Sequence, residues 1–395
     1  MEPYTFTIDE ADIQDLQNRL ARTRWPDPLP GVSDWSRGVP VEAAKAWAQE
    51  LSDLDWRSLQ DELNAFPQFL ARIDGESIHV IHVRSARSDA VPLLVLHGWP
   101  GTVVELLDLI GPLTAPEADD VPAFHVVIPS HPGVGLSGPT TQPGWGVDRT
   151  ARAYATLMAE LGYTGYLVQG GDHGAVLAPH LGRVDPDHVR GIHVNAATIG
   201  FIPMGPLDEQ TIGQLTAVEQ RRLAAIGAFM TDGNGYNVIQ ATRPQTIGYG
   251  LEDSPVAQVT WIVEKVHAWT HGPAALTDRH YRDRHLGNVL LYWLTRTATS
   301  AANNVYAEYG DMFADPNAFA NSGVPTAVIA FAEDPSIRHF AEFSNTIVRW
   351  TDVETGGHFA ALEQPDQLIA DLRAFTTELI GIAPSGAAAR PDAQR

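Results

Sequence analysis

The chain has 395 residues, 44% of them hydrophobic, which suits one large domain with an inserted lobe or two domains. Lysine and arginine number 26 against 48 aspartate and glutamate, and the net charge of −22 argues against nucleic acid or an anionic membrane as a partner. The absence of cysteine excludes disulfides, thiolate metal sites and thiol chemistry. With no signal-peptide pattern and no run near the roughly 18 apolar residues of a membrane span, we expect a soluble, cytoplasmic protein.

Residues 1–75 are predicted to form a largely helical segment outside the core. Residues 12–20 and 41–63 each repeat apolar side chains at helical spacing, and the stretch between them is rich in proline and glycine. Residues 69–83 predict a hairpin that turns at Asp74 and Gly75.

From residue 91 on, short apolar runs alternate with helical stretches. Continuous apolar strands between helices predict a mostly parallel sheet flanked by helices, an α/β fold. Residues 76–199 and 313–383 carry this pattern, and the mostly helical insertion 200–312 is expected to form a cap. Residues 384–395 are expected to be a disordered tail. The predicted strands are residues 93–96, 125–128, 166–168, 192–194, 326–329 and 347–350.

The sequence Gly170-Gly171-Asp172-His173-Gly174 lies between one of these strands and a helical stretch. A nucleophile flanked by small residues at such a junction is typical of the nucleophile elbow of α/β-hydrolases. Asp172 stands where an esterase has serine, and a carboxylate attacks carbon electrophiles such as epoxides and alkyl halides to form an ester. The competing interpretation is an ordinary aspartate in a glycine turn beside a helix.

Two later segments offer the rest of a triad in the order nucleophile, acid, histidine. His358 follows the last predicted strand within a glycine-containing loop that can aim its imidazole at the elbow. Glu333 and Asp334 follow the strand that ends near residue 330, and a carboxylate there would orient the imidazole and stabilise its cation. Both acids qualify on position alone.

The sequence His97-Gly98-Trp99-Pro100-Gly101 directly follows the first core strand. In this architecture a backbone N–H of that loop and the N–H after the nucleophile form the oxyanion hole. The predicted donors are therefore the backbone N–H groups of Trp99 and His173.

Together, the motifs HGWPG, GGDHG, AFAED and GGHFAALEQP resemble those of the microsomal-type epoxide hydrolases of the α/β-hydrolase superfamily. The resemblance extends to residues 63–69, 73–75 and 235–244, and so covers nearly the whole chain. It implies that Asp334 is the acid, and that Tyr236 and Tyr306 in the cap are the ring-opening tyrosines, with Tyr309 less favoured for the second position. His173 departs from the family's usual tryptophan, which preserves the N–H but changes the pocket wall.

The resemblance implies a cofactor-free and metal-free epoxide hydrolase that converts a small-molecule epoxide and water into a vicinal diol. The animal members have an N-terminal membrane anchor that is not seen here, and soluble actinomycete members act in natural-product pathways, including enediyne antibiotics. We therefore expect an enzyme of antibiotic biosynthesis. The oligomeric state is left open, a homo-oligomer included.

Other interpretations of these motifs require features of their own. A haloalkane or haloacid dehalogenase uses the same Asp-His-Asp triad but needs halide donors, and a non-catalytic small-molecule receptor would have a broken triad. The glycines of residues 133–138 spell G-x-G-x-x-G but do not open a helix, which argues against a dinucleotide site. His267 and His271 have the spacing of a zinc motif without its glutamate.

Overall fold

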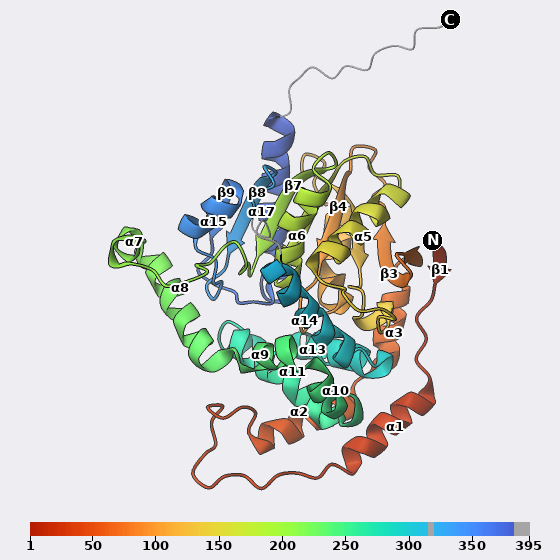
Figure 1. Ribbon diagram of the computed structural model, residues 1–395. Helices are drawn as coiled ribbons and strands as arrows, with labels where there is room; N and C mark the ends of the chain where they lie inside the picture. The colour runs from red at the N-terminus through yellow and green to blue at the C-terminus, as the bar shows by residue number, and fades with distance from the viewer. Residues whose placement is uncertain (315–319, 383–395) are drawn as a thin grey trace, which may run out of the picture.

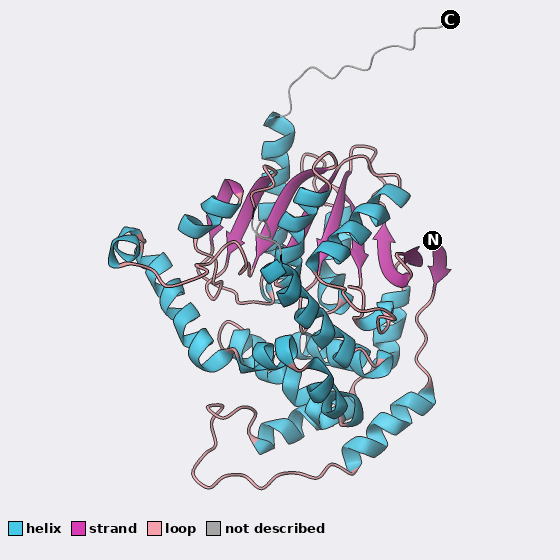
Figure 2. Ribbon diagram, in the orientation of Figure 1, coloured by secondary structure: helices cyan, strands magenta, loops and turns pink. Residues whose placement is uncertain are grey.

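The computed structural model describes residues 1–314 and 320–382. A nine-stranded sheet in the order β1-β2-β3-β5-β4-β6-β7-β8-β9 lies between helices on both faces, with further helices grouped beyond one end of its strands (Figures 1 and 2). The predicted α/β-hydrolase architecture is confirmed. The strands are β1 (Glu2–Tyr4), β2 (Gln68–Ile73), β3 (Glu76–Val83), β4 (Val91–Leu96), β5 (Phe124–Pro129), β6 (Tyr166–Gly171), β7 (Val189–Asn195), β8 (Pro325–Ala330) and β9 (Thr346–Asp352).

The strands from β4 to β9 are parallel, and β1, β2 and β3 add an antiparallel edge. Both faces of the parallel part are covered, which explains why its strands are apolar throughout instead of alternating. Leu93 packs with the cluster on one face and Leu94 with the cluster on the other, and both are fully buried. The covering helices are α4 (Leu107–Thr114), α5 (Val147–Glu160), α6 (His173–Val184), α15 (Arg338–Ser344), α16 (Ala360–Glu363) and α17 (Pro365–Ile382).

The N-terminal segment reaches both the sheet and the cap. It contains β1, α1 (Glu10–Ala21), α2 (Val41–Asp53) and α3 (Trp56–Asn64). Residues 41–63, predicted as one helical stretch, form two helices because Leu54 is extended and the Asp55 side chain caps α3 by accepting from Ser58 N. The predicted hairpin is confirmed: β2 and β3 pair around Asp74 and Gly75, which have φ of 50° and 84°.

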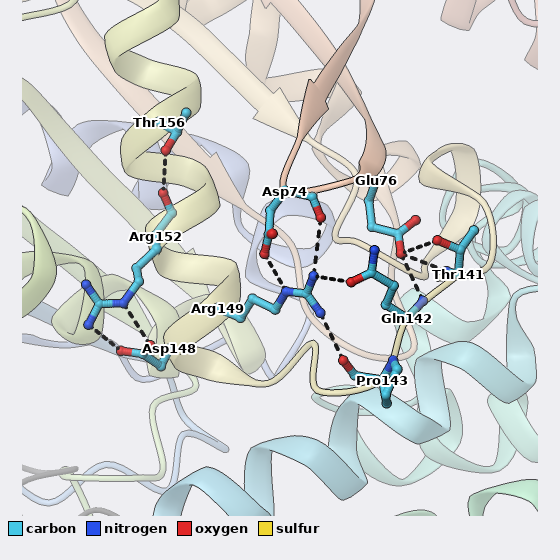
Figure 3. A network of polar contacts seen from close by, with 9 residues as sticks. All are labelled: Asp74, Glu76, Thr141, Gln142, Pro143, Asp148, Arg149, Arg152 and Thr156. Atoms are coloured by element: carbon cyan, nitrogen blue, oxygen red, sulfur yellow. Dashed lines mark hydrogen bonds and ion pairs between the residues drawn. The ribbon is translucent and has the colours of Figure 1, made fainter.

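The loop after β5 is fastened to that hairpin (Figure 3). Glu76, 5% exposed, accepts from Thr141 N at 2.7 Å and from Gln142 N at 3.1 Å. Arg149 donates to Asp74 Oδ2 at 2.5 Å. The glycine-rich stretch forms only the short 3₁₀ turn η2 (Gly135–Ser137), so it does not present the helix N-terminus that a dinucleotide phosphate needs.

The insertion between β7 and β8 is helical and packs against the N-terminal segment. Helix α11 contacts both α1 and α2, and Figure 1 shows these elements side by side beyond the strand ends. The predicted tail, residues 384–395, lies outside the described residues. The helices of the insertion are α7 (Glu209–Gln214), α8 (Ala217–Ala228), the π-helical turn η3 (Phe229–Gly233), α9 (Gly235–Thr242), α10 (Pro244–Asp253), α11 (Pro255–Trp269), α12 (Pro273–Thr277), α13 (Arg279–Thr295) and α14 (Ala298–Ala314).

Candidate active site

Asp172 occupies a strained turn between β6 and α6. Its φ of 54° and ψ of −118° lie in a region that non-glycine residues rarely adopt, at a cost on the order of 1–3 kcal/mol. Its neighbours must be small: a Cβ on Gly170 would lie 2.4 Å from the Gly174 carbonyl carbon, and one on Gly174 would lie 2.5 Å from Leu96 O. Although Asp172 immediately precedes α6, its side chain does not cap the helix. The backbone therefore presents the carboxylate beyond the strand ends, as a nucleophile elbow does.

The loop after β4 contacts the Asp172 carboxylate directly. Trp99 N donates to Asp172 Oδ1 at 2.9 Å. A Cβ on Gly98 would lie 2.4 Å from Asp172 Cβ, so glycine is needed for this close approach. Trp99 N therefore occupies the position predicted for an oxyanion-hole donor. The second predicted donor, His173 N, begins α6, and its role stays a prediction.

His358 faces the other carboxylate oxygen. Its Nε2 lies 3.6 Å from Asp172 Oδ2. Its backbone N–H donates to Trp269 O at 3.0 Å, and the two rings lie 4.7 Å apart. Burial lowers the pKa of the imidazole, although the charges of Asp172 and Asp334 partly oppose this. The ring is therefore neutral at pH 7 and able to accept a proton.

The loop that carries His358 is held by Glu363, at the end of α16. The Glu363 carboxylate accepts from Gly357 N at 2.9 Å and from Phe359 N at 3.1 Å, on either side of the histidine. It also accepts from His271 N at 2.8 Å, which joins the loop to the insertion. The imidazole is thus positioned through both of its neighbours.

The two candidate acids lie in different environments. Asp334 is 4% exposed and accepts from Ala196 N at 2.5 Å and from Ser336 N at 2.8 Å. Burial raises its pKa, and those hydrogen bonds oppose the rise. The Glu333 side chain is 56% exposed and pairs with His271 Nδ1 at 3.0 Å. Asp334 is thus the buried acid whose charge acts on His358.

Tyr236 lies on the insertion side of the site. Its ring stacks on Trp99 with centroids 4.9 Å apart and an angle of 11°, and meets Trp269 edge-on at 5.5 Å. Burial raises the pKa of its phenol, and the negative charge of Asp172 adds to the rise. The structure therefore brings Tyr236 into the electrostatic environment of the nucleophile with its proton in place.

The two tyrosines of α14 differ in their surroundings. Tyr306 is 55% exposed, whereas Tyr309 is partly buried and its Oη accepts from Asn237 Nδ2 at 2.5 Å. Tyr309 also acts electrostatically on Tyr236, which precedes Asn237 in the chain. The structure thus places Tyr309 beside Tyr236 and leaves Tyr306, the predicted second donor, largely in solvent.

An ion pair connects the elbow to the insertion. His173 Nδ1 lies 2.7 Å from Glu308 Oε2 on α14. Burial disfavours the imidazolium, but Glu308 outweighs it by charge and hydrogen bonding and, with Asp172, raises the pKa of His173 to about 9. The residue after the nucleophile is therefore a cation at pH 7.

Two small cavities flank Trp99. One, of about 30 Å³, is lined by Asp172 and His358, and also by Glu105 from η1 (Val103–Leu106). The other, of about 40 Å³, is lined by Trp99, His173 and Glu308. The nucleophile and its base thus line the same small cavity.

The described residues contain no cluster of histidine and acidic side chains fit to hold a metal ion. His267 stacks on Trp35 at 3.8 Å, and His271 pairs with Glu333, so the two histidines serve separate contacts. No helix in the described part of the chain is long and apolar enough to cross a bilayer.

Comparisons with known proteins show the family of this chain. Residues 1–106 match the family described as the epoxide hydrolase N terminus, and residues 91–226 match the alpha/beta hydrolase fold. Epoxide hydrolase 1 of Sus scrofa is 31% identical over 95% of this chain and 88% of its own. The chain belongs to the microsomal-type epoxide hydrolase family.

Solved structures of this family show the same arrangement over the whole chain. The epoxide hydrolase of Aspergillus niger is 33% identical, with a TM-score of 0.84 over 96% of each chain. The juvenile hormone epoxide hydrolase of Bombyx mori is 27% identical, with a TM-score of 0.87 over 96% of this chain and 95% of its own. The protein is thus a hydrolase of the α/β-hydrolase fold.

Sequence reasoning missed three acids at this epoxide hydrolase site. Glu363 stands inside the GGHFAALEQP motif, which by itself assigns the glutamate no role. Glu105 is a lone carboxylate in the apolar run Val103-Val104-Glu105-Leu106-Leu107, which is a signal that could have found it. Glu308 has no such signal, because its partner His173 is far away in sequence.

Proposed function

We propose that this protein hydrolyses an epoxide to a vicinal diol through an ester of Asp172. The observation that carries the proposal is the difference between the partners of the two Asp172 carboxylate oxygens. Oδ1 accepts the Trp99 N–H, whereas Oδ2 faces His358 Nε2 at 3.6 Å. A carboxylate with one oxygen bound and the other beside a neutral base suits a nucleophile whose ester is then hydrolysed.

In the first half-reaction, Asp172 Oδ2 attacks an epoxide carbon from the side opposite the ring oxygen. The new C–O bond forms as the ring C–O bond breaks, and the negative charge passes to the ring oxygen. Tyr236 donates its phenolic proton to that oxygen, because an alkoxide is a poor leaving group. Its stacking on Trp99, the residue that binds Oδ1, supports this role.

In the second half-reaction, His358 accepts a proton from water as the water oxygen attacks Asp172 Cγ. The oxyanion forms on Oδ1, where the Trp99 N–H stabilises it, assisted in this proposal by His173 N. The Cγ–O bond to the product then breaks, and His358 returns its proton to the departing diol oxygen. The second water proton leaves the restored Asp172 carboxyl group and reprotonates the Tyr236 phenolate.

Asp334 and a second tyrosine complete the proposal. Buried Asp334 stabilises the His358 cation, and exposed Glu333 does not take this role. For the second phenol, the resemblance favours Tyr306, and the contacts described above favour Tyr309.

The resemblance also leads us to propose a role in natural-product biosynthesis and a location in the cytoplasm. If both are right, deletion of the gene should make an epoxide accumulate in the cytosol.

The covalent intermediate provides the decisive test. In His358→Gln the nucleophile and the oxyanion hole remain but the base is lost. We expect this variant to open one equivalent of styrene oxide and stop as an ester mapped to Asp172 by intact-protein and peptide mass spectrometry. Asp172→Asn, of the same shape, is the matched control and should form no adduct.

The same experiment can contradict the proposal. Full turnover by His358→Gln, or an adduct on another residue, would be incompatible with this mechanism. Dehalogenation is tested in parallel by halide release from alkyl halides. Halide release by the wild-type protein without any diol formation from epoxides would favour the dehalogenase alternative.

A further inference from the structure

The cavity beside the nucleophile is the right size for water and too small for an epoxide substrate. Its volume of about 30 Å³ accommodates one or two molecules, since a water needs roughly 10–15 Å³. Its polar lining includes Asp172, His358 and Glu105. A water there would lie beside both the carbon it must attack and the base that takes its proton.

Glu105 reaches this cavity because the loop before it leaves room. A Cβ on Gly101 would lie 1.9 Å from Glu105 Oε2, so any other residue at position 101 would displace the carboxyl group. The Gly98 N–H forms a hydrogen bond to Glu105. Trp99, between these two glycines, donates its own N–H to Asp172 Oδ1. One short loop therefore positions both the nucleophile and the Glu105 carboxyl group.

We propose that Glu105 binds the water that hydrolyses the Asp172 ester and orients it jointly with His358. This inference rests on the proposed function. One water hydrogen points to His358 Nε2 and transfers to it as the oxygen bonds to Asp172 Cγ. The other hydrogen is accepted by a Glu105 carboxyl oxygen and stays on the water oxygen during the attack. This arrangement directs a lone pair of the water at Cγ.

The surroundings of Glu105 favour its neutral, protonated form, which suits this role. Burial raises the pKa of Glu105 to about 8, the Asp172 charge adds to the rise, and the Gly98 hydrogen bond opposes it. Tyr281 and Tyr292 of α13 also interact with Glu105, and their phenols stay protonated because burial raises their pKa values. A neutral carboxyl still accepts a hydrogen bond, whereas a second carboxylate would oppose the oxyanion that forms on Asp172.

The test separates the two half-reactions in Glu105→Leu, which removes both carboxyl oxygens and keeps a side chain of similar length. Rapid-quench mass spectrometry with styrene oxide measures ester formation and ester decay. We expect formation within about twofold of wild type and decay at least about tenfold slower, so that the ester accumulates and kcat falls more than kcat/KM. Equal rates of decay in variant and wild type, or an equal loss in both steps, would overturn the inference.

A matched variant tests whether a neutral acceptor oxygen is sufficient. Glu105→Gln preserves the shape and one acceptor oxygen, so ester decay should stay within about threefold of wild type. Decay in folded Glu105→Gln as slow as in Glu105→Leu would overturn the role of Glu105 as a hydrogen-bond acceptor. Buried Glu76, which fastens the loop after β5 and does not line the cavity beside the nucleophile, offers a matched control. Glu76→Gln should lower thermal stability and leave the ratio of the two rates unchanged.

The outcome for His358→Gln distinguishes a failure of the proposed mechanism from a failure of the role proposed for Glu105. If that variant accumulates the ester and Glu105→Leu does not, the mechanism stands and only the role of Glu105 is refuted. If neither forms an ester while wild type makes diol, the Asp172 ester of the proposed function is refuted.

Discussion

The sheet side and the insertion side of the active site are built in different ways. On the sheet side, Asp172, Trp99 and His358 stand in loops at strand ends, and backbone hydrogen bonds and closely packed glycines place them. On the insertion side, Tyr236, Tyr309 and Glu308 stand on helices, so their direction depends on which face of the helix turns inward. Local backbone geometry defines the sheet side, and helix packing defines the insertion side.

Short sequence motifs therefore predict the sheet side better than the insertion side. A turn such as Gly170–Gly174 carries its own steric requirements, so a short sequence predicts it. Residues three apart on a helix, such as Tyr306 and Tyr309, point to neighbouring positions, and only the packing of α14 separates them.

The strongest test of the sheet side compares its two adjacent acids. Asp334→Asn retains the shape but removes the charge that stabilises the His358 cation, so ester decay should slow by roughly 10³-fold. Glu333→Gln changes an exposed side chain and should alter decay by less than about twofold. Single-turnover ester decay checks both variants. A larger loss in Glu333→Gln than in Asp334→Asn would show that the acid is misassigned.

The insertion side is tested by removing one hydroxyl at a time. Tyr236→Phe should slow ester formation by roughly 10²-fold, because the ring oxygen loses a proton donor, while thermal stability is unchanged. Tyr306→Phe and Tyr309→Phe form a matched pair on α14, and we expect the larger loss in Tyr309→Phe. Pre-steady-state ester formation measures all three. A greater loss in Tyr306→Phe would mean that α14 turns when substrate binds.

The ion pair between His173 and Glu308 joins the two sides, and its contribution should depend on pH. The pKa of His173 is raised to about 9 from the usual 6.5, so the stabilisation is complete below about pH 6.5 and is lost as the pH rises through 9. Glu308→Gln should lower the free energy of unfolding by on the order of 2 kcal/mol at pH 6 and by little at pH 10. Denaturant unfolding across this range checks the sign.

An exposed pair provides the control for this experiment. Glu342 pairs with Arg338 at 2.7 Å on α15, with both side chains about half exposed. Glu342→Gln should change stability by less than about 1 kcal/mol at every pH. A loss in Glu308→Gln that grows toward pH 10 would contradict the assignment of a protonated His173.

The smallest expected effect is that of metal removal. The proposed steps use only carboxylate, imidazole, phenol and backbone groups, on both sides of the site. Exhaustive chelation followed by dialysis should leave diol formation within experimental error of the untreated protein. Loss of activity that a divalent cation restores would contradict the proposed chemistry on both sides.

The fold class and the residues of the sheet side could be predicted from the sequence. Alternating apolar strands and helices predicted the parallel sheet, and the motifs around Asp172, Trp99 and His358 predicted residues that the structure brings together. These features are local: a sharp turn needs glycines, and a buried strand needs apolar residues. The same locality explains the hairpin at Asp74 and Gly75.

Features that join distant segments of the chain became visible only in the tertiary structure. It buried Asp334 and exposed Glu333, although both follow the same strand, and it turned Tyr309 toward Asn237. It also paired His173 with Glu308 and enclosed Glu105 beside Asp172. The charge and protonation of these groups depend on burial and on partners far along the chain, and no local pattern encodes either one.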